Sequence, residues 1–237
     1  MQLDCQEHPD VVARECRVLD ARPGMVLLAG SPIFPGGGGQ LMDIASIAWT
    51  GGRAAVREVT AGDGGLWHAF DGDAVLADTV LVTIDAPFRN LMRELHTLAH
   101  VANSVVFRDF GGALLTGAQL SADATFRLDF DLPGADNDRL RALDGPINDV
   151  IRQDLPVRAF HMPWDDANAT AGLFRSKSVA PPRQADGLVR IVEIADLDRQ
   201  GCGGTHLAST GQARRVKILK IENKGRQNRR VRIGFAD

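Results

Sequence analysis

Between residues 16 and 84 the chain alternates short apolar, β-branched runs with turn-forming residues. The apolar runs are CRVLDA, MVLLAG, IASIAW, AAVREV and VLVTID, and the turns between them include RPG, TGGR and AGDGG. Several short strands with glycine-rich turns predict a compact antiparallel sheet or a small barrel. A run of four glycines in FPGGGGQ interrupts the series, and we expect it to form a loop.

At DAPFRN the apolar spacing changes from that of strands to that of a helix. Pro87 is well placed to open this helix, and Phe88, Met92, Leu95, Ala99, Ala102 and Val106 follow at helical spacing. We therefore predict a domain boundary at this point. An N-terminal β-barrel-like domain with the Gly-rich loop would occupy residues 1–85, and a second domain would occupy residues 86–237.

The second domain is predicted to mix strands and helices. Its strand candidates are GALLTGAQL, TFRLDFD, VRAFHM, GLVRIVEIA, RVKILKIEN and RRVRIGF, and KGRQN is expected to be a hairpin turn between the last two. An amphipathic helix is expected near Asn137–Gln153, and Gly145-Pro146 must bend or break it. The predicted fold class of the whole chain is α+β.

Two pairs of metal-capable side chains stand out, and each pair is spaced by four residues. His96 and His100 lie in HTLAH on the predicted helix, so both imidazoles project from one face about one turn apart. Cys202 and His206 repeat the spacing in CGGTH, where two glycines let the backbone turn tightly. Three histidines and a thiolate form a donor set that suits tetrahedral zinc.

Chance is the alternative explanation for these pairs. A single histidine on a helix is usually a packed or surface residue, and a single buried cysteine is usually inert. The two pairs nevertheless use four of the nine cysteine and histidine residues in the chain. No comparable partner accompanies the remaining five, which we interpret as packed or surface residues: His8, His68, His161, Cys5 and Cys16.

Composition narrows the classes of function. With 44% hydrophobic and 24% charged residues, the chain of 237 residues has the composition of a globular protein with a real core. A net charge of −3 argues against nucleic-acid binding through bulk positive charge. The N-terminal segment has neither a signal-peptide core nor a membrane span, and three cysteines do not make a disulfide framework. We expect a cytoplasmic protein without a membrane partner.

The motifs taken together resemble a known family. HTLAH followed at long range by CGGTH, with FPGGGGQLMD upstream and KIENKGRQNRRVRI at the end, resembles the AlaX-type trans-editing proteins, which are free-standing alanyl-tRNA synthetase editing domains. The resemblance covers nearly the whole chain. It implies an N-terminal β-barrel-like domain followed by the α/β editing domain that threonyl- and alanyl-tRNA synthetases share. It also implies a hydrolase that removes serine, and in some members glycine, from mischarged alanine tRNA without using ATP.

The resemblance assigns roles to residues of this chain. The zinc ligands would be His96, His100, Cys202 and His206. Gln40 and Thr97 would be catalytic, by holding a water for attack on the ester. The substrate-binding positions would be Gly38, Gly39, Asp43, Gly203, Gly204 and Thr205.

Basic residues near the C-terminus supply candidate contacts to tRNA phosphates. The candidates lie in FRSKSVAPPR and in the last hairpin, and they are Lys177, Arg183, Lys224, Arg226, Arg229 and Arg230. The alternative is a solvated hairpin face, which is the usual fate of such a charge run.

Two questions stay open at the level of sequence. A zinc ion with three protein ligands could lower the pKa of a bound water, whereas four ligands would close the shell and leave zinc to order the pocket, hold the substrate or stabilise the fold. The alternatives to tRNA editing are a metallo-esterase for small esters and a zinc-stabilised RNA-binding module without catalysis.

Overall fold

The computed structural model describes residues 3–177, 184 and 186–236. The chain divides into two compact units, one of Met1–Gly37 with Leu41–Asn90 and the other of Gly38–Gln40 with Leu91–Asp237. The predicted division into domains at 1–85 and 86–237 stays a prediction.

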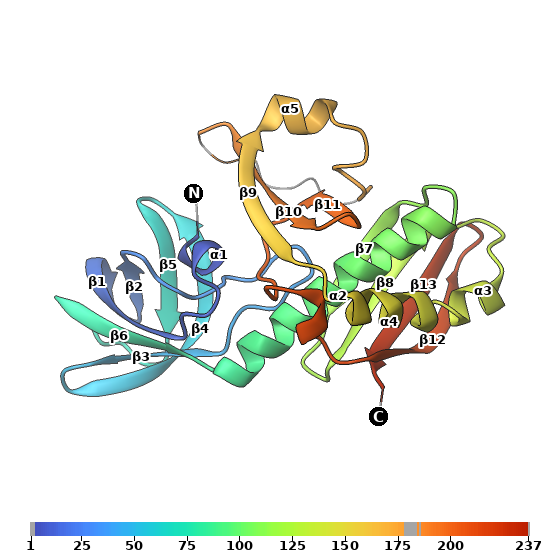
Figure 1. Cartoon of the computed structure of the whole chain (residues 1–237). Helices are drawn as coiled ribbons and strands as arrows, with labels where there is room; N and C mark the ends of the chain where they lie inside the picture. The colour runs from blue at the N-terminus through green and yellow to red at the C-terminus, as the bar shows by residue number, and fades with distance from the viewer. Residues whose placement is uncertain (1–2, 178–183, 185, 237) are drawn as a thin grey trace. The chain divides into compact units, whose positions relative to one another are not determined.

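The first unit contains the antiparallel barrel that the sequence predicts (Figure 1). Six strands close it in the order β1-β2-β5-β4-β3-β6. They are β1 (Ala13–Arg22), β2 (Met25–Leu28), β3 (Ala45–Trp49), β4 (Gly52–Gly62), β5 (Gly65–Phe70) and β6 (Thr79–Ile84), and a short helix α1 (Asp4–Glu7) precedes them. Alternate residues of β6 point into the core, where Val80, Val82 and Ile84 are buried.

One barrel strand was missing from the predicted runs. β5 has the sequence GLWHAF, in which a histidine interrupts the apolar pattern. His68 is nevertheless fully buried, because Val26 O and Ser31 Oγ lie within hydrogen-bonding distance of its two ring nitrogens. A polar residue in a barrel interior is tolerated when both of its ring nitrogens find partners.

The second unit is built around two antiparallel sheets (Figure 1). The four-stranded sheet has the order β12-β13-β8-β7, with β7 (Leu115–Leu120), β8 (Thr125–Asp131), β12 (Val216–Lys224) and β13 (Asn228–Phe235). The three-stranded sheet has the order β11-β10-β9, with β9 (Val157–Pro163), β10 (Leu188–Ile194) and β11 (Asp198–Gly201). The predicted hairpin turn is confirmed, because Lys224 pairs with Asn228 across it.

The helix predicted near Asn137–Gln153 is broken earlier than Gly145-Pro146. It forms two helices, α3 (Asn137–Arg141) and α4 (Asp144–Gln153). Pro146 therefore lies in the first turn of α4, where its missing N–H costs nothing because first-turn amides have no partner within the helix. Two further helical segments of the unit are the short α5 (Trp164–Ala169), which the sequence did not predict, and the 3-10 turn η1 (Thr210–Gln212).

The long helix α2 (Ala86–Asp109) carries the HTLAH motif. It begins as predicted beside Pro87, and the Asp85 carboxylate accepts a hydrogen bond from the Phe88 amide at 2.8 Å, as a helix N-cap does. Every residue from Met92 to Val106 is buried. A helix buried all round must satisfy its polar side chains within the protein, since unpaired buried polar groups are costly. None of the helices in the part of the chain described here is long and apolar enough to cross a membrane.

A fully buried ion pair of the first unit joins the segment after the Gly-rich loop to the start of α2. Neither the Arg89 nor the Asp43 side chain is exposed, and the guanidinium donates to both carboxylate oxygens, from Nε at 2.8 Å and from Nη2. Asp43 also accepts from the Phe34 amide, and Arg89 donates to Pro9 O and Pro32 O. The structure therefore gives Asp43 a structural environment, and its role in substrate binding stays a prediction.

We expect Asp43→Asn to lower the free energy of unfolding by about 3–5 kcal/mol, because it leaves the Arg89 charge buried without its partner. Denaturant unfolding of the variant measures this loss. Asp71→Asn is the matched control, since the Arg57–Asp71 pair is about 60% exposed on each side and should contribute at most about 1 kcal/mol. Equal, small losses in both variants would show that the buried pair does not hold this unit together.

Candidate metal centre

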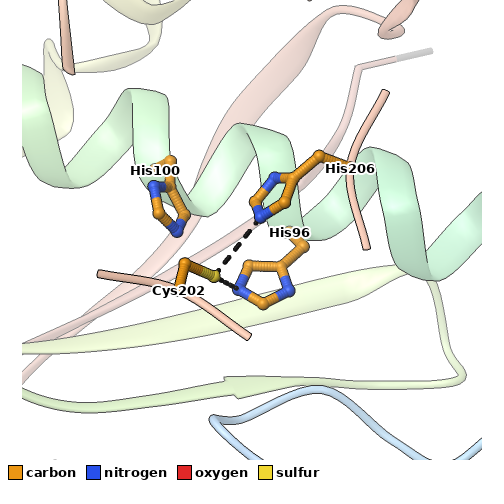
Figure 2. Close-up of side chains that lie close together, drawn as sticks. All are labelled: His96, His100, Cys202 and His206. Carbon is orange, nitrogen blue, oxygen red and sulfur yellow. Dashed lines mark hydrogen bonds between the residues drawn. The ribbon is translucent and has the colours of Figure 1, made fainter. Parts of the chain in front are cut away.

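The two predicted pairs of ligands converge in the second unit (Figure 2). His96 and His100 project from α2 one turn apart, and Cys202 and His206 come from the loop that follows β11. One nitrogen or sulfur atom from each of the four side chains lies within 4.8 Å of all the others. Residues from two segments about a hundred positions apart thus form one cluster.

The spacing within the cluster fits a tetrahedral metal ion. Cys202 Sγ lies 3.5 Å from His96 Nε2 and 3.4 Å from His206 Nε2. Zinc–sulfur and zinc–nitrogen bonds of ordinary length at a tetrahedral angle would separate sulfur from nitrogen by about 3.6 Å. The thiol is therefore spaced from His96 and His206 as zinc ligands are, and the donor types of all four side chains are those that zinc prefers.

Gln40 orients the first of the three imidazoles. Its Oε1 accepts a hydrogen bond from His96 Nδ1 at 2.8 Å and another from the Thr205 amide at 3.0 Å, while its Nε2 donates to Thr205 Oγ1 at 2.9 Å. A carbonyl oxygen can only accept, so the proton of His96 resides on Nδ1. The lone pair of His96 Nε2 then points toward Cys202.

Thr97 orients His206 in the same sense. The Thr97 hydroxyl donates to Arg93 O at 2.9 Å, so its oxygen is left to accept from the Leu207 amide at 3.0 Å and from His206 Nδ1 at 3.3 Å. His206 Nε2 is thereby left as the free nitrogen on the side of Cys202.

Asp198 orients the third imidazole. This residue begins β11, its side chain is fully buried, and its Oδ2 lies 2.9 Å from His100 Nδ1. A partner on the outer nitrogen of each ligating histidine is the usual arrangement around protein-bound metals, because it fixes the tautomer and the ring orientation. The sequence reasoning missed Asp198. The only signal would have been two polar residues, Asp198 and Gln200, that alternate on a strand just before the CGGTH motif.

The charges of the cluster are strongly coupled when no metal neutralises them. Burial by itself raises the pKa of the Cys202 thiol, but the three nearby imidazoles lower that pKa well below its usual value. Burial by itself lowers the pKa of His100, but the Cys202 thiolate and Asp198 raise it to about 10. Burial and the charge of His96 lower the pKa of His206 to about 3. Without a metal, these couplings favour the thiolate form of Cys202 and the protonated form of His100.

Two buried arginines fix the loop that carries Cys202 and His206. Arg190 on β10 donates to Cys202 O at 2.9 Å and to Gly204 O at 3.0 Å. Arg93 on α2 donates to His206 O at 2.8 Å. Sequence reasoning did not single out either arginine, because a charged residue on a strand or helix gives no sign that it is buried.

Glycine is required at position 204 because the loop passes close to His96. Neither Gly203 nor Gly204 has a positive φ, so the motif does not depend on a left-handed turn there. A Cβ on Gly204 would instead lie 2.1 Å from His96 Cε1. The loop passes so close to the imidazole that no side chain fits between them.

The end of the Gly-rich loop is held against β7. Gly39 has a φ of +88°, a Cβ there would lie 2.8 Å from Ala118 O, and the Leu120 amide donates to Gly39 O at 2.8 Å. This close approach brings Gln40 to His96. Gly38 also has a positive φ of +59° and has open space around it. The substrate-binding roles predicted for Gly38, Gly39, Gly203, Gly204 and Thr205 stay predictions.

The predicted RNA-binding residues differ in exposure and in whether an ion pair neutralises their charge. Lys224 and Arg226 are exposed at the turn between β12 and β13. Lys177 is half exposed and forms an ion pair with Asp131. Arg183 lies outside the described residues.

The two remaining candidates on β13 have partners within the protein. Arg230 donates to both carboxylate oxygens of Asp129, at 2.7 and 2.8 Å. Arg229 is 9% exposed and donates to Asn228 O at 3.2 Å. The exposed turn is therefore the better candidate for a phosphate contact.

Comparison with known proteins gives a consistent result. Residues 189–232 match the family model described as "Threonyl and Alanyl tRNA synthetase second additional domain". The chain is 32% identical over 221 residues to the alanyl-tRNA editing protein AlaX-M of Saccharolobus solfataricus, covering 92% of this chain and 91% of that protein. It is also 32% identical to AlaX-M of Methanosarcina barkeri, covering 90% of this chain and 89% of that one.

A longer class of protein matches as well. The alanine–tRNA ligase of Korarchaeum cryptofilum is 31% identical over 217 residues, which are 90% of this chain but only 24% of the ligase. The match to the AlaX-M proteins, in contrast, extends over most of both chains. On this similarity, together with the barrel and the shared editing domain, the chain belongs to the AlaX-M family of alanyl-tRNA editing proteins.

Proposed function

We propose that this protein is a zinc-dependent hydrolase that acts in trans on mischarged alanine tRNA and releases serine, and also glycine, from its acceptor end. The observation that carries the proposal is the convergence of His96, His100, Cys202 and His206 in a chain of this family. Relatives matched over most of their length carry the name alanyl-tRNA editing protein, which supports the same substrate here.

The donor set supports a zinc ion that is held by the protein on all sides. Four side chains converge, and four is the number of ligands that zinc takes in a closed tetrahedral site. Zinc bound there would supply a positive centre that orders the surrounding pocket. This reading favours an ordering role over that of a three-ligand site with an open position for water.

The proposed catalytic residues have different hydrogen-bonding capacity left for a substrate or water. Thr97 has one donor and two lone pairs, and Arg93, Leu207 and His206 occupy all three. Gln40 uses both lone pairs of Oε1 and one hydrogen of Nε2, so its second amide hydrogen has no acceptor among the described residues. We therefore assign Thr97 to the positioning of His206, and keep Gln40 as the residue that can also hold a water.

The selectivity of such a site follows from the chemistry of its substrates. Serine differs from alanine by one hydroxyl, and a pocket that is not built to bind this group rejects it by only about 100-fold. A second site that hydrogen-bonds the hydroxyl binds the serine ester and leaves the correct alanine ester without a partner. For serine, an editing site therefore discriminates by using the group that the synthetic site cannot exclude. Glycine has no such group, so its release has to depend on its smaller size relative to alanine.

The direct test is deacylation of serine-, glycine- and alanine-charged alanine tRNA. We expect the zinc-loaded protein to hydrolyse the serine ester, and the glycine ester as well, faster than the alanine ester. Cys202→Ala should lose about 100-fold or more of this rate, since removal of a ligand costs more than the 10–100-fold that loss of an outer partner costs. Cys16→Ala is the matched control, because Cys16 is a buried cysteine of the barrel.

The outcomes separate the alternatives. Hydrolysis of all three charged tRNAs at their spontaneous rates would refute the editing function. Turnover of small acyl esters with no turnover of charged tRNA would identify a metallo-esterase. Binding of RNA without turnover, together with unfolding on metal removal, would identify a zinc-stabilised binding module.

The apparent zinc affinity should fall as the pH falls. His100 has a pKa of about 10 in the metal-free site, so zinc must displace its proton at any lower pH. Acid therefore weakens binding, by about tenfold per pH unit for this one proton. Titration against a chelator of known pH dependence between about pH 6 and pH 8 measures the slope. A flat profile would show that no proton leaves the site when zinc binds.

We also propose that the β12–β13 turn contacts tRNA phosphates. Lys224→Ala and Arg226→Ala should each weaken tRNA binding and reduce the dependence of affinity on salt by about one unit of log–log slope. Arg230→Ala should have a smaller effect, because Asp129 already neutralises that charge. Binding assays over a range of salt concentrations provide the test, and equal slopes in all variants would place the RNA elsewhere.

A further inference from the structure

A buried polar network lies next to the ligand cluster. Its centre is Asp198, whose side chain has no exposed surface. Four side chains donate hydrogen bonds to its carboxylate: His100 and Ser104 of α2, Gln200 of β11, and Arg175 of the segment after α5. Neither HTLAH nor CGGTH contains Asp198, so the motifs that indicate the metal do not indicate this residue.

The two oxygens of the carboxylate divide their partners. Oδ2 accepts from His100 Nδ1 at 2.9 Å and from Gln200 Nε2 at 2.8 Å. Oδ1 accepts from Ser104 Oγ, from Gln200 Nε2 at 2.9 Å and from Arg175 Nη1 at 3.1 Å. Gln200 thus bridges both oxygens, and among the contacts of the described residues with this carboxylate only that of His100 reaches a ligand.

We propose that Asp198 is a positioning residue for the metal centre, because its carboxylate holds the Nδ1 proton of His100 and so presents Nε2 to the ion. The inference rests on the proposed zinc site and names an outer residue of it. A carboxylate accepts hydrogen bonds and cannot donate them. A His100 tautomer with its proton on Nε2 would therefore place two acceptors, Nδ1 and Asp198 Oδ2, against each other with no proton between them. Carboxylate–histidine pairs of this kind also make the imidazole a stronger donor.

Asp198 differs from the groups that orient the other two imidazoles. Gln40 and Thr97 are neutral, and the Thr97 contact to His206 is long at 3.3 Å. A hydrogen bond to an ionised acceptor is about twice as strong as one between neutral groups. Arg175 Nη1 lies 3.1 Å from Asp198 Oδ1. Its positive charge compensates the charge of the buried carboxylate, so Asp198 can stay ionised without the charge of a metal.

The alternative is that Asp198 only ties α2, β11 and the Arg175 segment together. The two roles make different predictions, because Ser104 binds the same carboxylate without touching a ligand. A purely structural network should lower zinc affinity only in step with the loss of stability of each metal-free variant. A positioning role requires that zinc binding respond to Asp198 far more than to Ser104.

The test compares Asp198→Asn, Ser104→Ala and a control variant, Glu94→Gln, in the full chain. Glu94 is a buried carboxylate on the same helix that pairs with Arg214, outside the ligand cluster. Zinc affinity is measured by chelator competition, and cobalt-loaded protein reports ligand geometry through its visible absorption. The melting temperature of each metal-free variant reports stability alone.

We expect Asp198→Asn to lower zinc affinity by 10–100-fold and to change the cobalt spectrum, with less than about threefold change for the other two variants. Zinc affinity of Asp198→Asn within about threefold of wild type, or an equal loss in Ser104→Ala, would overturn the proposal. Failure of the wild-type protein to bind zinc would overturn it together with the metal centre. A zinc-affinity loss confined to Asp198→Asn would support it even if no charged tRNA were hydrolysed, an outcome that refutes only the deacylase function.

A second measurement covers the case in which Asp198→Asn does not fold. Long-range proton–nitrogen NMR of the zinc-loaded wild-type protein reports which ring nitrogen of His100 carries the proton. The proposal requires a protonated Nδ1 and a metal-bound Nε2. A protonated Nε2 would refute it without any substitution.

Discussion

The ligand cluster of the second unit depends on hydrogen bonds to the Nδ1 atoms of its three histidines. His96, His100 and His206 lie inside the protein, and each can offer Nε2 to a metal only if a neighbour accepts the proton on Nδ1. The accepting groups are an amide oxygen, a carboxylate and a hydroxyl, and they come from three different parts of the fold. The Gly-rich loop supplies Gln40, β11 supplies Asp198, and α2 itself supplies Thr97. The arrangement of loop, strand and helix around α2 is the arrangement that satisfies these three protons.

The need to orient the three imidazoles also explains two glycines and two arginines that have no direct role in the reaction. Gly39 lets the loop approach β7 so that Gln40 reaches His96, and Gly204 lets the CGGTH loop approach the same imidazole. Arg190 and Arg93 hold the carbonyls of that loop. Because protein interiors are closely packed, a small shift of either loop would move a ligand. The metal centre is therefore supported by groups that a list of ligands does not include.

The family relationship covers the two halves of the ligand cluster unequally. The match to the family model covers residues 189–232, which include Cys202 and His206 but not α2. His96 and His100 come from outside that segment. The long alignments to the AlaX-M proteins and to the alanine–tRNA ligase each cover about 90% of this chain, so they carry more information about the site than the short family model does.

The sequence by itself determined the α+β class, the barrel, the start of α2 and the four members of the cluster. These features depend on local signals: apolar spacing, a proline at a helix start, and metal-capable residues four apart. It did not find β5, the position of the break between α3 and α4, or Asp198, Arg190 and Arg93. The strand β5 and the three missed residues depend on which polar side chain finds a buried partner, as His68 does in β5 and Asp198 does beside His100. Burial and pairing join residues that are far apart in the chain, so only the tertiary structure decided them.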